Sequence, residues 1–249
     1  MTVTSTDLGT ARILCWDRQA RRNAWDIPTM TALADALERA GSEEQVRSVI
    51  VRGAGDHFSA GDDLFCAIEA DAAAWARTIE AFQRLTRVVL DLPIPVIAAI
   101  DGACIGGALE FAASCDVRIA TRRARFGTPE VTIGLVATNG GTIFLPAILG
   151  ETAARRLLLT GALQDADWAD RHGFLTELVD GLDEAITRWS FVFDATSREA
   201  VARTKAMLNA RHGHLLPEAM ERETQACVEL FDGPDAPAAL AAFADSRAD

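Results

Sequence analysis

Short apolar runs alternate with longer segments of helical periodicity through about residue 135. The strand-like runs are Ala11–Trp16, Val46–Val51, Val96–Ile100 and Val117–Ala120. Helical spacing lies between them, at Pro28–Arg39, Ala70–Leu92 and Gly106–Ala113. Because Val96–Ile100 contains no polar residue and ends at Asp101-Gly102, we expect it to be a buried strand. The alternation predicts an α/β fold in which helices cover a sheet.

From Gly140 onward nearly every segment has helical spacing. The expected helices are Gly141–Leu149, Glu151–Leu159, Asp165–His172, Asp183–Phe193, Arg198–Asn209 and Pro217–Leu230. We therefore expect an α/β core over residues 1–190 and a C-terminal helical region over 191–249, together forming one functional unit. Helices in such a tail often pack against a neighbouring subunit.

The charge balance excludes several kinds of partner. The chain has 24 Lys and Arg against 36 Asp and Glu, a net charge of −12, which opposes binding to nucleic-acid phosphates. Its longest apolar stretch, Ile94–Ile100, is too short to cross a bilayer, and its N-terminus lacks a secretion signal pattern. We expect a cytoplasmic protein that binds neither nucleic acid nor membrane. An anionic ligand would need a local cationic cluster, and Arg18, Arg21 and Arg22 form one.

The cysteines and histidines indicate neither a disulfide framework nor a metal site. The five cysteines are odd in number, widely spaced and without a C-x-x-C pair. His212-Gly213-His214 has no neighbouring carboxylate or cysteine to complete a ligand set. We expect no metal.

Two glycine-containing turns follow strand-like runs, at Phe58–Leu64 and Ile105–Glu110. Neither contains G-x-G-x-x-G or a P-loop, so no nucleotide-binding motif is indicated. Small residues at a strand-to-helix turn expose backbone N–H groups, and two converging N–H groups would stabilise charge on a carbonyl oxygen. Taken singly, each turn is better explained by glycines that permit a tight bend.

Two glutamates lie in apolar surroundings. Glu110 is flanked by Leu109 and Phe111, and Glu130 lies between Pro129 and Val131. Such glutamates are costly unless paired or functional, and two near one pocket can divide acid and base roles. Otherwise, Glu110 is a carboxylate favoured by a helix N-terminus and Glu130 a surface turn residue.

Six short motifs follow one another at characteristic spacings: Arg18–Ala24, Phe58–Leu64, Pro95–Gly102, Gly106–Glu110, Cys115–Ala120 and Phe126–Glu130. In this order they resemble the enoyl-CoA hydratase/isomerase, or crotonase, superfamily. The resemblance covers most of the chain, to Thr204-Lys205 and on to Phe243–Arg247.

The resemblance implies a crotonase-type spiral of ββα units, followed by C-terminal helices that assemble homotrimers or dimers of trimers. It implies an acyl-CoA thioester as substrate, with no further cofactor. The thioester oxygen would lie between the backbone N–H groups of Asp62 and Gly107. Glu110 and Glu130 match the two glutamates of family hydratases.

The resemblance also assigns two binding regions. The residues expected to contact CoA are Arg18, Ala20, Arg21, Arg22, Ala60, Asp63 and Leu64. The residues expected to shape the acyl pocket are Trp25, Phe65, Thr138 and Asn139.

The expected activity is hydration of the 2,3-double bond of an enoyl-CoA. Glu110 would deprotonate water and Glu130 would protonate C2. Isomerisation, or another acyl-CoA reaction by a lyase, decarboxylase or hydrolase, is the alternative on the same fold, and binding without turnover is a third interpretation. The chain departs from the family pattern at Gln19, at Trp25 and in the run Val136–Gly141, which leaves the acyl group open.

Overall fold

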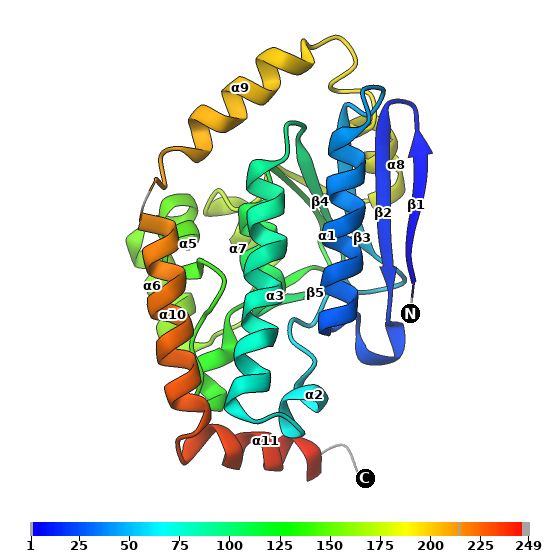
Figure 1. The fold of residues 1–249 in the computed structure, drawn as a ribbon. Helices are drawn as coiled ribbons and strands as arrows, with labels where there is room; N and C mark the ends of the chain where they lie inside the picture. Colours follow the sequence, from blue (N-terminus) through cyan, green and yellow to red (C-terminus); the bar gives the residue numbers. More distant parts are fainter. Residues whose placement is uncertain (1, 214, 246–249) are drawn as a thin grey trace.

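The computed structural model describes residues 2–213 and 215–245, which fold into two sheets surrounded by helices (Figure 1). The larger sheet has six strands in the order β1-β2-β3-β4-β6-β9, and the smaller has three in the order β5-β7-β8. The strands are β1 Thr2–Leu8, β2 Ala11–Asp17, β3 Ser48–Gly53, β4 Val96–Ile100, β5 Ala103–Ile105, β6 Val117–Thr121, β7 Arg125–Gly127, β8 Gln164–Asp165 and β9 Glu177–Val179. From β2 to β9 the large sheet is parallel, and β1 is an antiparallel edge strand. The α/β class is confirmed.

The helices surround these sheets and form the end of the chain. They are α1 Ile27–Ser42, α2 Leu64–Ile68, α3 Ala72–Asp91, α4 Gly107–Ser114, α5 Gly141–Leu149, α6 Glu151–Thr160, α7 Ala166–Arg171, α8 Leu182–Trp189, α9 Arg198–Asn209, α10 Leu215–Phe231 and α11 Asp235–Asp245. Two short 3₁₀ helices, η1 and η2, span Gln19–Arg21 and Pro129–Ile133. None of the helices in residues 2–213 and 215–245 is both long and apolar enough to span a membrane.

The chain advances as a spiral that alternates between the two sheets. After β4 it turns into β5, and after β6 it turns into β7, so each turn adds one strand to each sheet. The turn of the spiral that follows β3 joins the smaller sheet through an isolated bridge, in which Ser59 pairs in parallel with Cys104 of β5. Adjacent turns of the spiral therefore place their connecting loops side by side.

The central strand β4 is buried on both faces, as its apolar run predicts. Val96, Ala98 and Ile100 face the main core, while Ile97 and Ala99 face a second cluster that helix α8 covers. Because successive strand residues point to opposite sides, a strand covered on both sides needs apolar residues at every position.

Several elements depart from the sequence-based expectation. The chain beyond residue 140 contains β8 and β9 as well as helices, and β1, β5, β7, α2 and α11 had no predicted counterpart. Most of these are too short to show a period, and β1 is a polar edge strand. By contrast, α5 and α9 have the predicted bounds.

The last two helices pack against the body of the chain, whereas α9 stands apart from it (Figure 1). Helix α10 lies along α3, where the Phe231 and Trp75 rings stack with their centroids 5.2 Å apart, and α11 contacts α2. Two cations tie α9 to the rest of the described chain: buried Lys205 donates through Nζ to Asp116 at 2.7 Å and to the Ile94 carbonyl at 3.1 Å, and Arg198 donates to the Gly41 carbonyl at 2.6 Å.

Candidate active site

The two glycine-containing turns lie on neighbouring turns of the spiral. Ser59 N–H donates to the Ala103 carbonyl at 2.8 Å, and Ile105 N–H donates back to Ser59 at 3.2 Å. Gly61 has φ +89°, and a Cβ there would lie 2.6 Å from the Ile105 carbonyl oxygen. Only glycine allows this approach, which brings residue 62 next to the start of helix α4.

The backbone N–H groups of Asp62 and Gly107 donate to no other described residue at this junction, and the Asp62 amide contacts the carboxylate of its own side chain. The amides around them are used: Gly61 donates to Ser59 Oγ at 3.0 Å, Asp63 to Trp25 at 3.0 Å and Gly106 to Gly127 at 2.8 Å. Within residues 2–213 and 215–245, no other residue accepts a hydrogen bond from Asp62 N–H or Gly107 N–H. Gly107 is the first residue of α4, so its amide carries the positive end of the helix dipole.

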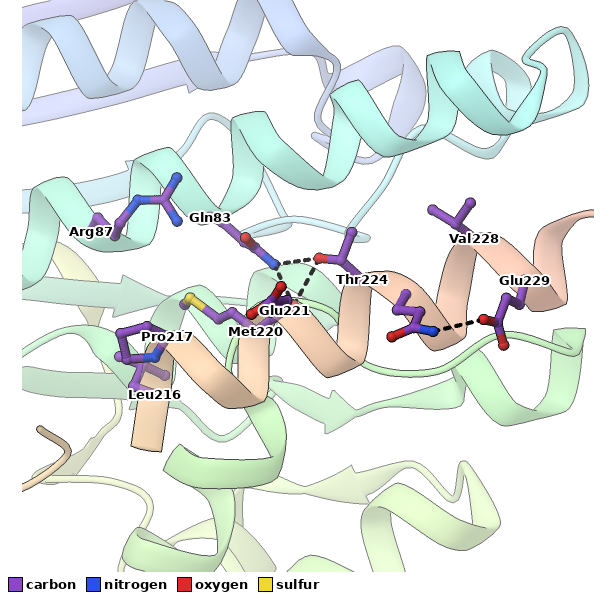
Figure 2. Close-up of a pocket in the computed structure, with 10 residues that line it drawn as sticks. Gln83, Arg87, Leu216, Pro217, Met220, Glu221, Thr224, Val228 and Glu229 are labelled. Carbon is purple, nitrogen blue, oxygen red and sulfur yellow. Dashed lines mark hydrogen bonds between the residues drawn. The ribbon is translucent and has the colours of Figure 1, made fainter. Parts of the chain in front are cut away.

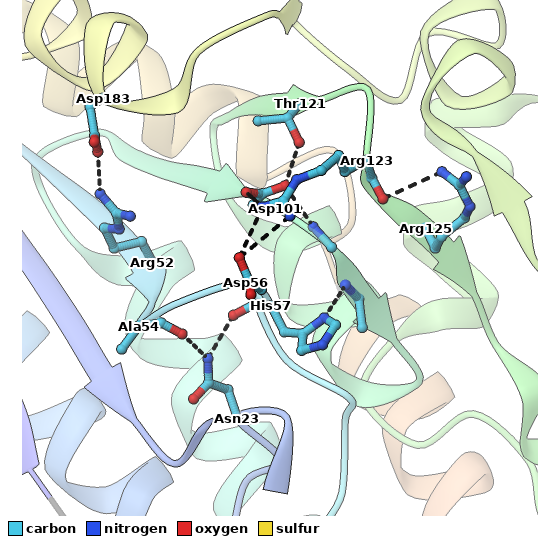
Figure 3. A network of polar contacts seen from close by, with 12 residues as sticks. Asn23, Arg52, Ala54, Asp56, His57, Asp101, Thr121, Arg123, Arg125 and Asp183 are labelled. Carbon is cyan, nitrogen blue, oxygen red and sulfur yellow. Dashed lines mark hydrogen bonds and ion pairs between the residues drawn. The ribbon is translucent and has the colours of Figure 1, made fainter. Parts of the chain in front are cut away.

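The segment Ala54–His57, which precedes the turn that carries Asp62, is held by polar contacts with neighbouring loops (Figure 3). Asn23 Nδ2 donates to the carbonyls of Ala54 and His57, at 2.8 and 2.6 Å, and His57 Nδ1 accepts from the Ala103 amide at 3.1 Å. Arg123 bridges Asp101 and Asp56 on the same side. These contacts hold three consecutive turns of the spiral in register.

Glu110 is buried in the first turn of α4 and contacts the loop before α5. Its Oε1 accepts from the amides of Asn139 and Gly141, at 2.9 and 2.8 Å, and its Oε2 lies 3.4 Å from the Thr138 amide nitrogen. Burial raises the pKa of Glu110 well above its usual value, and the nearby Glu223 and Glu130 carboxylates raise it further. The amide contacts favour the ionised form and act in the opposite direction.

Glu223 of α10 binds the same helix start. It accepts from the amides of Gly140 and Thr142, at 2.8 and 3.0 Å, and from Thr142 Oγ1 at 2.6 Å. Burial raises its pKa, while these donors oppose the shift. Sequence reasoning gave no sign of this residue, because only the packing of α10 brings it to the site.

Glu130 lies in η2 and faces the glycine turn. A Cβ on Gly106 would lie 2.8 Å from Glu130 Oε1. Its Oε2 is buried and has no hydrogen-bond partner among the described residues. Burial raises the pKa of Glu130 to about 8, with a further increase from the charge of Asp62. Glu130 therefore keeps its proton at neutral pH.

A cavity of about 70 Å³ lies between the two glycine turns. It is lined by Ala60, Asp62, Leu64, Trp75, Ile105, Gly106, Pro129, Glu130, Ile133, Leu135, Val136, Thr138 and Cys227. Five of the residues selected from the sequence line it, namely Ala60, Asp62, Leu64, Glu130 and Thr138. Trp75 and Cys227 come from α3 and α10, and no motif pointed to them.

Three of the four residues expected to shape the acyl pocket, namely Trp25, Phe65 and Asn139, do not line this cavity. Trp25 is 1% exposed and packs in the core against the rings of Trp16, Phe82 and Phe111. Phe65 and Asn139 are held in other positions by contacts with neighbouring residues. Phe65 packs against Arg21 and Phe243, and Asn139 is fully buried with its amide bound to Glu110.

The segment expected to bind CoA divides into a buried and an exposed part. Arg18 forms ion pairs with Asp63 at 2.7 Å and Asp26 at 3.1 Å, so it joins this segment to the Asp62 turn. Arg21 and Arg22 are exposed, like Ala20, and the Arg21 guanidinium lies 3.8 Å from the Phe65 ring centroid. Of the three arginines, Arg21 and Arg22 are therefore the two that are exposed to solvent.

A larger groove of about 710 Å³ runs between α3 and α10 (Figure 2). Gln83 crosses its floor, where Nε2 donates to the Thr138 carbonyl at 2.8 Å and to Thr224 Oγ1 at 2.9 Å. None of the residues selected from the sequence line this groove. Through these hydrogen bonds, Gln83 fastens α10 to the loop that contacts Glu110.

No potential metal site is found in the described part of the chain, where no three His, Cys, Asp or Glu residues gather. His212 packs edge-on against the Phe144 ring, and its sequence neighbour His214 lies outside the described residues. All five cysteines are free thiols.

Comparison with known proteins places these features in a family. A sequence model of the enoyl-CoA hydratase/isomerase family matches residues 12–249. A crotonyl-CoA hydratase from Syntrophomonas wolfei is 31% identical over 239 residues, covering 94% of this chain and 92% of that protein. A short-chain-enoyl-CoA hydratase from Clostridium acetobutylicum is 30% identical over 242 residues, covering 96% and 93%. The crystal structure of an enoyl-CoA hydratase/isomerase from Xanthobacter autotrophicus Py2 matches with a TM-score of 0.89 and 31% identity, covering 99% of this chain and 93% of that one.

Proposed function

The chain belongs to the enoyl-CoA hydratase/isomerase family and has the crotonase fold, and from this premise we propose that it adds water across the 2,3-double bond of an enoyl-CoA thioester. The observation that carries the proposal is one small cavity lined by Asp62 and by a proton-bearing glutamate, with the Gly107 amide next to the lining residue Gly106 and a second glutamate behind the cavity wall. Hydration needs each of these groups.

The amides of Asp62 and Gly107 would receive the thioester oxygen. As water attacks C3, electron density moves through the double bond onto this oxygen and an enolate forms. Donors already aimed at the site of developing charge lower the barrier, and removing one such donor typically costs about 10²–10³-fold in rate. The dipole of α4 adds to the stabilisation at Gly107.

The two glutamates would divide the proton transfers. Glu110, whose ionised form two backbone amides favour against the effect of burial, takes a proton from the attacking water. Glu130, protonated at neutral pH and without a partner at Oε2, delivers a proton to C2. Water supplies a hydroxyl group to C3, and the proton gained by Glu110 must return to Glu130 or to solvent before the next turnover.

The remaining parts of the proposal concern binding and assembly. Arg21 and Arg22 would contact CoA phosphates, and no cofactor beyond CoA would be required. The chain would assemble as a homotrimer or a dimer of trimers, supported by exposed apolar side chains near and within α9: Phe191, Val192, Met207 and Leu208. A strictly monomeric mass in light scattering at micromolar concentration would contradict this assembly. A cytoplasmic location stays a prediction.

The decisive experiment separates the two glutamates. Glu110→Gln should lose crotonyl-CoA hydration by roughly 10²–10⁴-fold, as removal of a general base implies, yet retain exchange of the C2 protons of butyryl-CoA with deuterated water. Glu130→Gln should lose both activities. The control is Glu218→Gln, which makes the same change at an exposed position of α10.

Other outcomes would change the proposal in defined ways. Exchange that survives in Glu130→Gln and disappears in Glu110→Gln would reverse the two roles. Wild-type turnover that only moves the double bond would identify an isomerase. Normal hydration by both variants would show that the glutamates are structural and that the proposed mechanism is wrong.

A further inference from the structure

Asp62 places a second carboxyl group in the active-site cavity, beside that of Glu130. Its backbone amide is one of the two oxyanion donors, and its side chain lines the same cavity as Glu130 and Cys227. The charge of Asp62 contributes to the raised pKa of both neighbours. The side chain is therefore close to the reacting part of any bound acyl group.

No other described residue satisfies this carboxyl group. Among residues 2–213 and 215–245, Asp62 forms no ion pair and accepts no hydrogen bond from another residue. None of the cavity-lining residues is Lys, Arg or His, and most are apolar. Burial raises the pKa of Asp62 to about 7, and the backbone amide of the same residue is the donor that opposes this shift. A carboxyl group in such a place gains most from a donor supplied by the ligand.

We propose that the Asp62 side chain selects enoyl-CoA substrates whose acyl group carries a hydroxyl close to the thioester, and disfavours acyl groups that carry a carboxylate. The inference rests on the proposed hydratase function. The amide and carboxyl of one aspartate are separated by only a few covalent bonds, so a group that meets the carboxyl lies near the bound carbonyl, at about C4 of the acyl chain. A hydroxyl donates to Asp62 in either protonation state. An acyl carboxylate, in contrast, is repelled by the charge of ionised Asp62.

The test compares three enoyl-CoA thioesters in one protein. Pent-2-enoyl-CoA and 4-hydroxycrotonyl-CoA differ by a methyl group in place of a hydroxyl, and glutaconyl-CoA carries a carboxylate. The readout is the ratio of kcat/KM values between substrates, so a general loss of activity from a change at residue 62 cancels. Wild type should favour the hydroxyl substrate over pent-2-enoyl-CoA by about tenfold or more, as a hydrogen bond to a carboxylate implies.

Two variants separate the hydrogen bond from the charge. Asp62→Ala should abolish the preference for the hydroxyl substrate, whereas Asp62→Asn, which keeps an acceptor oxygen, should retain part of it. Both variants should raise the relative kcat/KM for glutaconyl-CoA by about tenfold or more, because both remove the charge. The matched control is Glu69→Ala, a charge removal at an exposed position close in sequence, which should leave both ratios unchanged.

The outcomes distinguish this inference from its premise. If wild type hydrates none of the three thioesters, the proposed function fails and the inference fails with it. If wild type hydrates pent-2-enoyl-CoA but the ratios do not change in Asp62→Ala, only the inference is overturned. The same holds if wild type shows no preference for the hydroxyl substrate.

Discussion

Glu110 and Glu223 accept hydrogen bonds from alternating backbone amides at the start of a single helix, α5. Glu110 takes those of residues 139 and 141, and Glu223 takes those of residues 140 and 142. The first amides of a helix have no partner within it, and its dipole favours nearby anions. Two buried carboxylates from α4 and α10 thus share one stabilising element while each opposes the ionisation of the other.

This arrangement predicts that Glu223→Gln shifts the pH dependence of catalysis. The negative charge of Glu223 raises the pKa of Glu110, which must be ionised to act as a base. Removing that charge should move the rising, acidic limb of the kcat/KM profile to lower pH. Loss of one acceptor should also cost about 1–3 kcal/mol of folding stability. Glu221→Gln, at an exposed position on the same helix, should change neither quantity. A lower rate with an unshifted profile would show that Glu223 only supports the fold.

Gly107→Ala should displace the oxyanion amide. A Cβ at this residue would lie 2.8 Å from the ring of Phe82, a buried core residue that cannot move freely. We expect kcat to fall by about 10²–10³-fold, the typical cost of losing one such donor. Gly181→Ala serves as the control, since nothing lies within 4 Å of its added Cβ. Phe82→Leu should restore part of the rate in the double variant, and full activity of Gly107→Ala alone would exclude this amide as a donor.

The arginines near the N-terminus should separate into structural and binding residues. Arg18→Gln leaves the buried Asp63 without its ion pair. The melting temperature should therefore fall, and the free energy of unfolding should decrease by about 3–5 kcal/mol. Arg21→Glu combined with Arg22→Glu should keep the melting temperature but raise KM for acyl-CoA more than it lowers kcat, because phosphate contacts are remote from the reacting bond. Equal affinity of the double variant and wild type for CoA at low salt would refute the phosphate contact.

Buried carboxyl groups with raised pKa values should make the fold less stable as pH rises. For Glu130 the pKa is about 8 in the folded chain against an ordinary 4.5. Folding therefore favours its protonated form, and stability present below about pH 4.5 is lost progressively as pH approaches 8. The loss is about 1.4 kcal/mol per pH unit for one such group. Melting temperatures at several pH values between 5 and 8 should fall less steeply in Glu130→Gln than in wild type, and identical slopes would contradict the shifted pKa.

The sequence predicted the parts of the molecule that depend on local pattern. The central strand β4 and helices α5 and α9 lie where the apolar period placed them. The two glycine turns also come together as the motifs implied, because parallel neighbours in a spiral align their connecting loops.

The cavity wall could not be predicted in this way. Trp75 and Cys227 are 152 residues apart in sequence, and their contact depends on how α10 packs against α3. Trp25 shows the converse: the family pattern suggested a ligand contact, whereas a neighbouring tryptophan and two phenylalanines draw it into the core. Which large aromatic residues face a ligand is decided by packing rather than by position in a motif.

The contribution of Cys227 to the cavity also bears on the order in which the protein is completed during translation. Cys227 lies in the last tenth of the 249-residue sequence, whereas Asp62, Gly107 and Glu130 are synthesised much earlier. Domains generally fold as units. The amides proposed to hold the thioester and the wall that α10 adds to the cavity should therefore form together, once the last helices have left the ribosome.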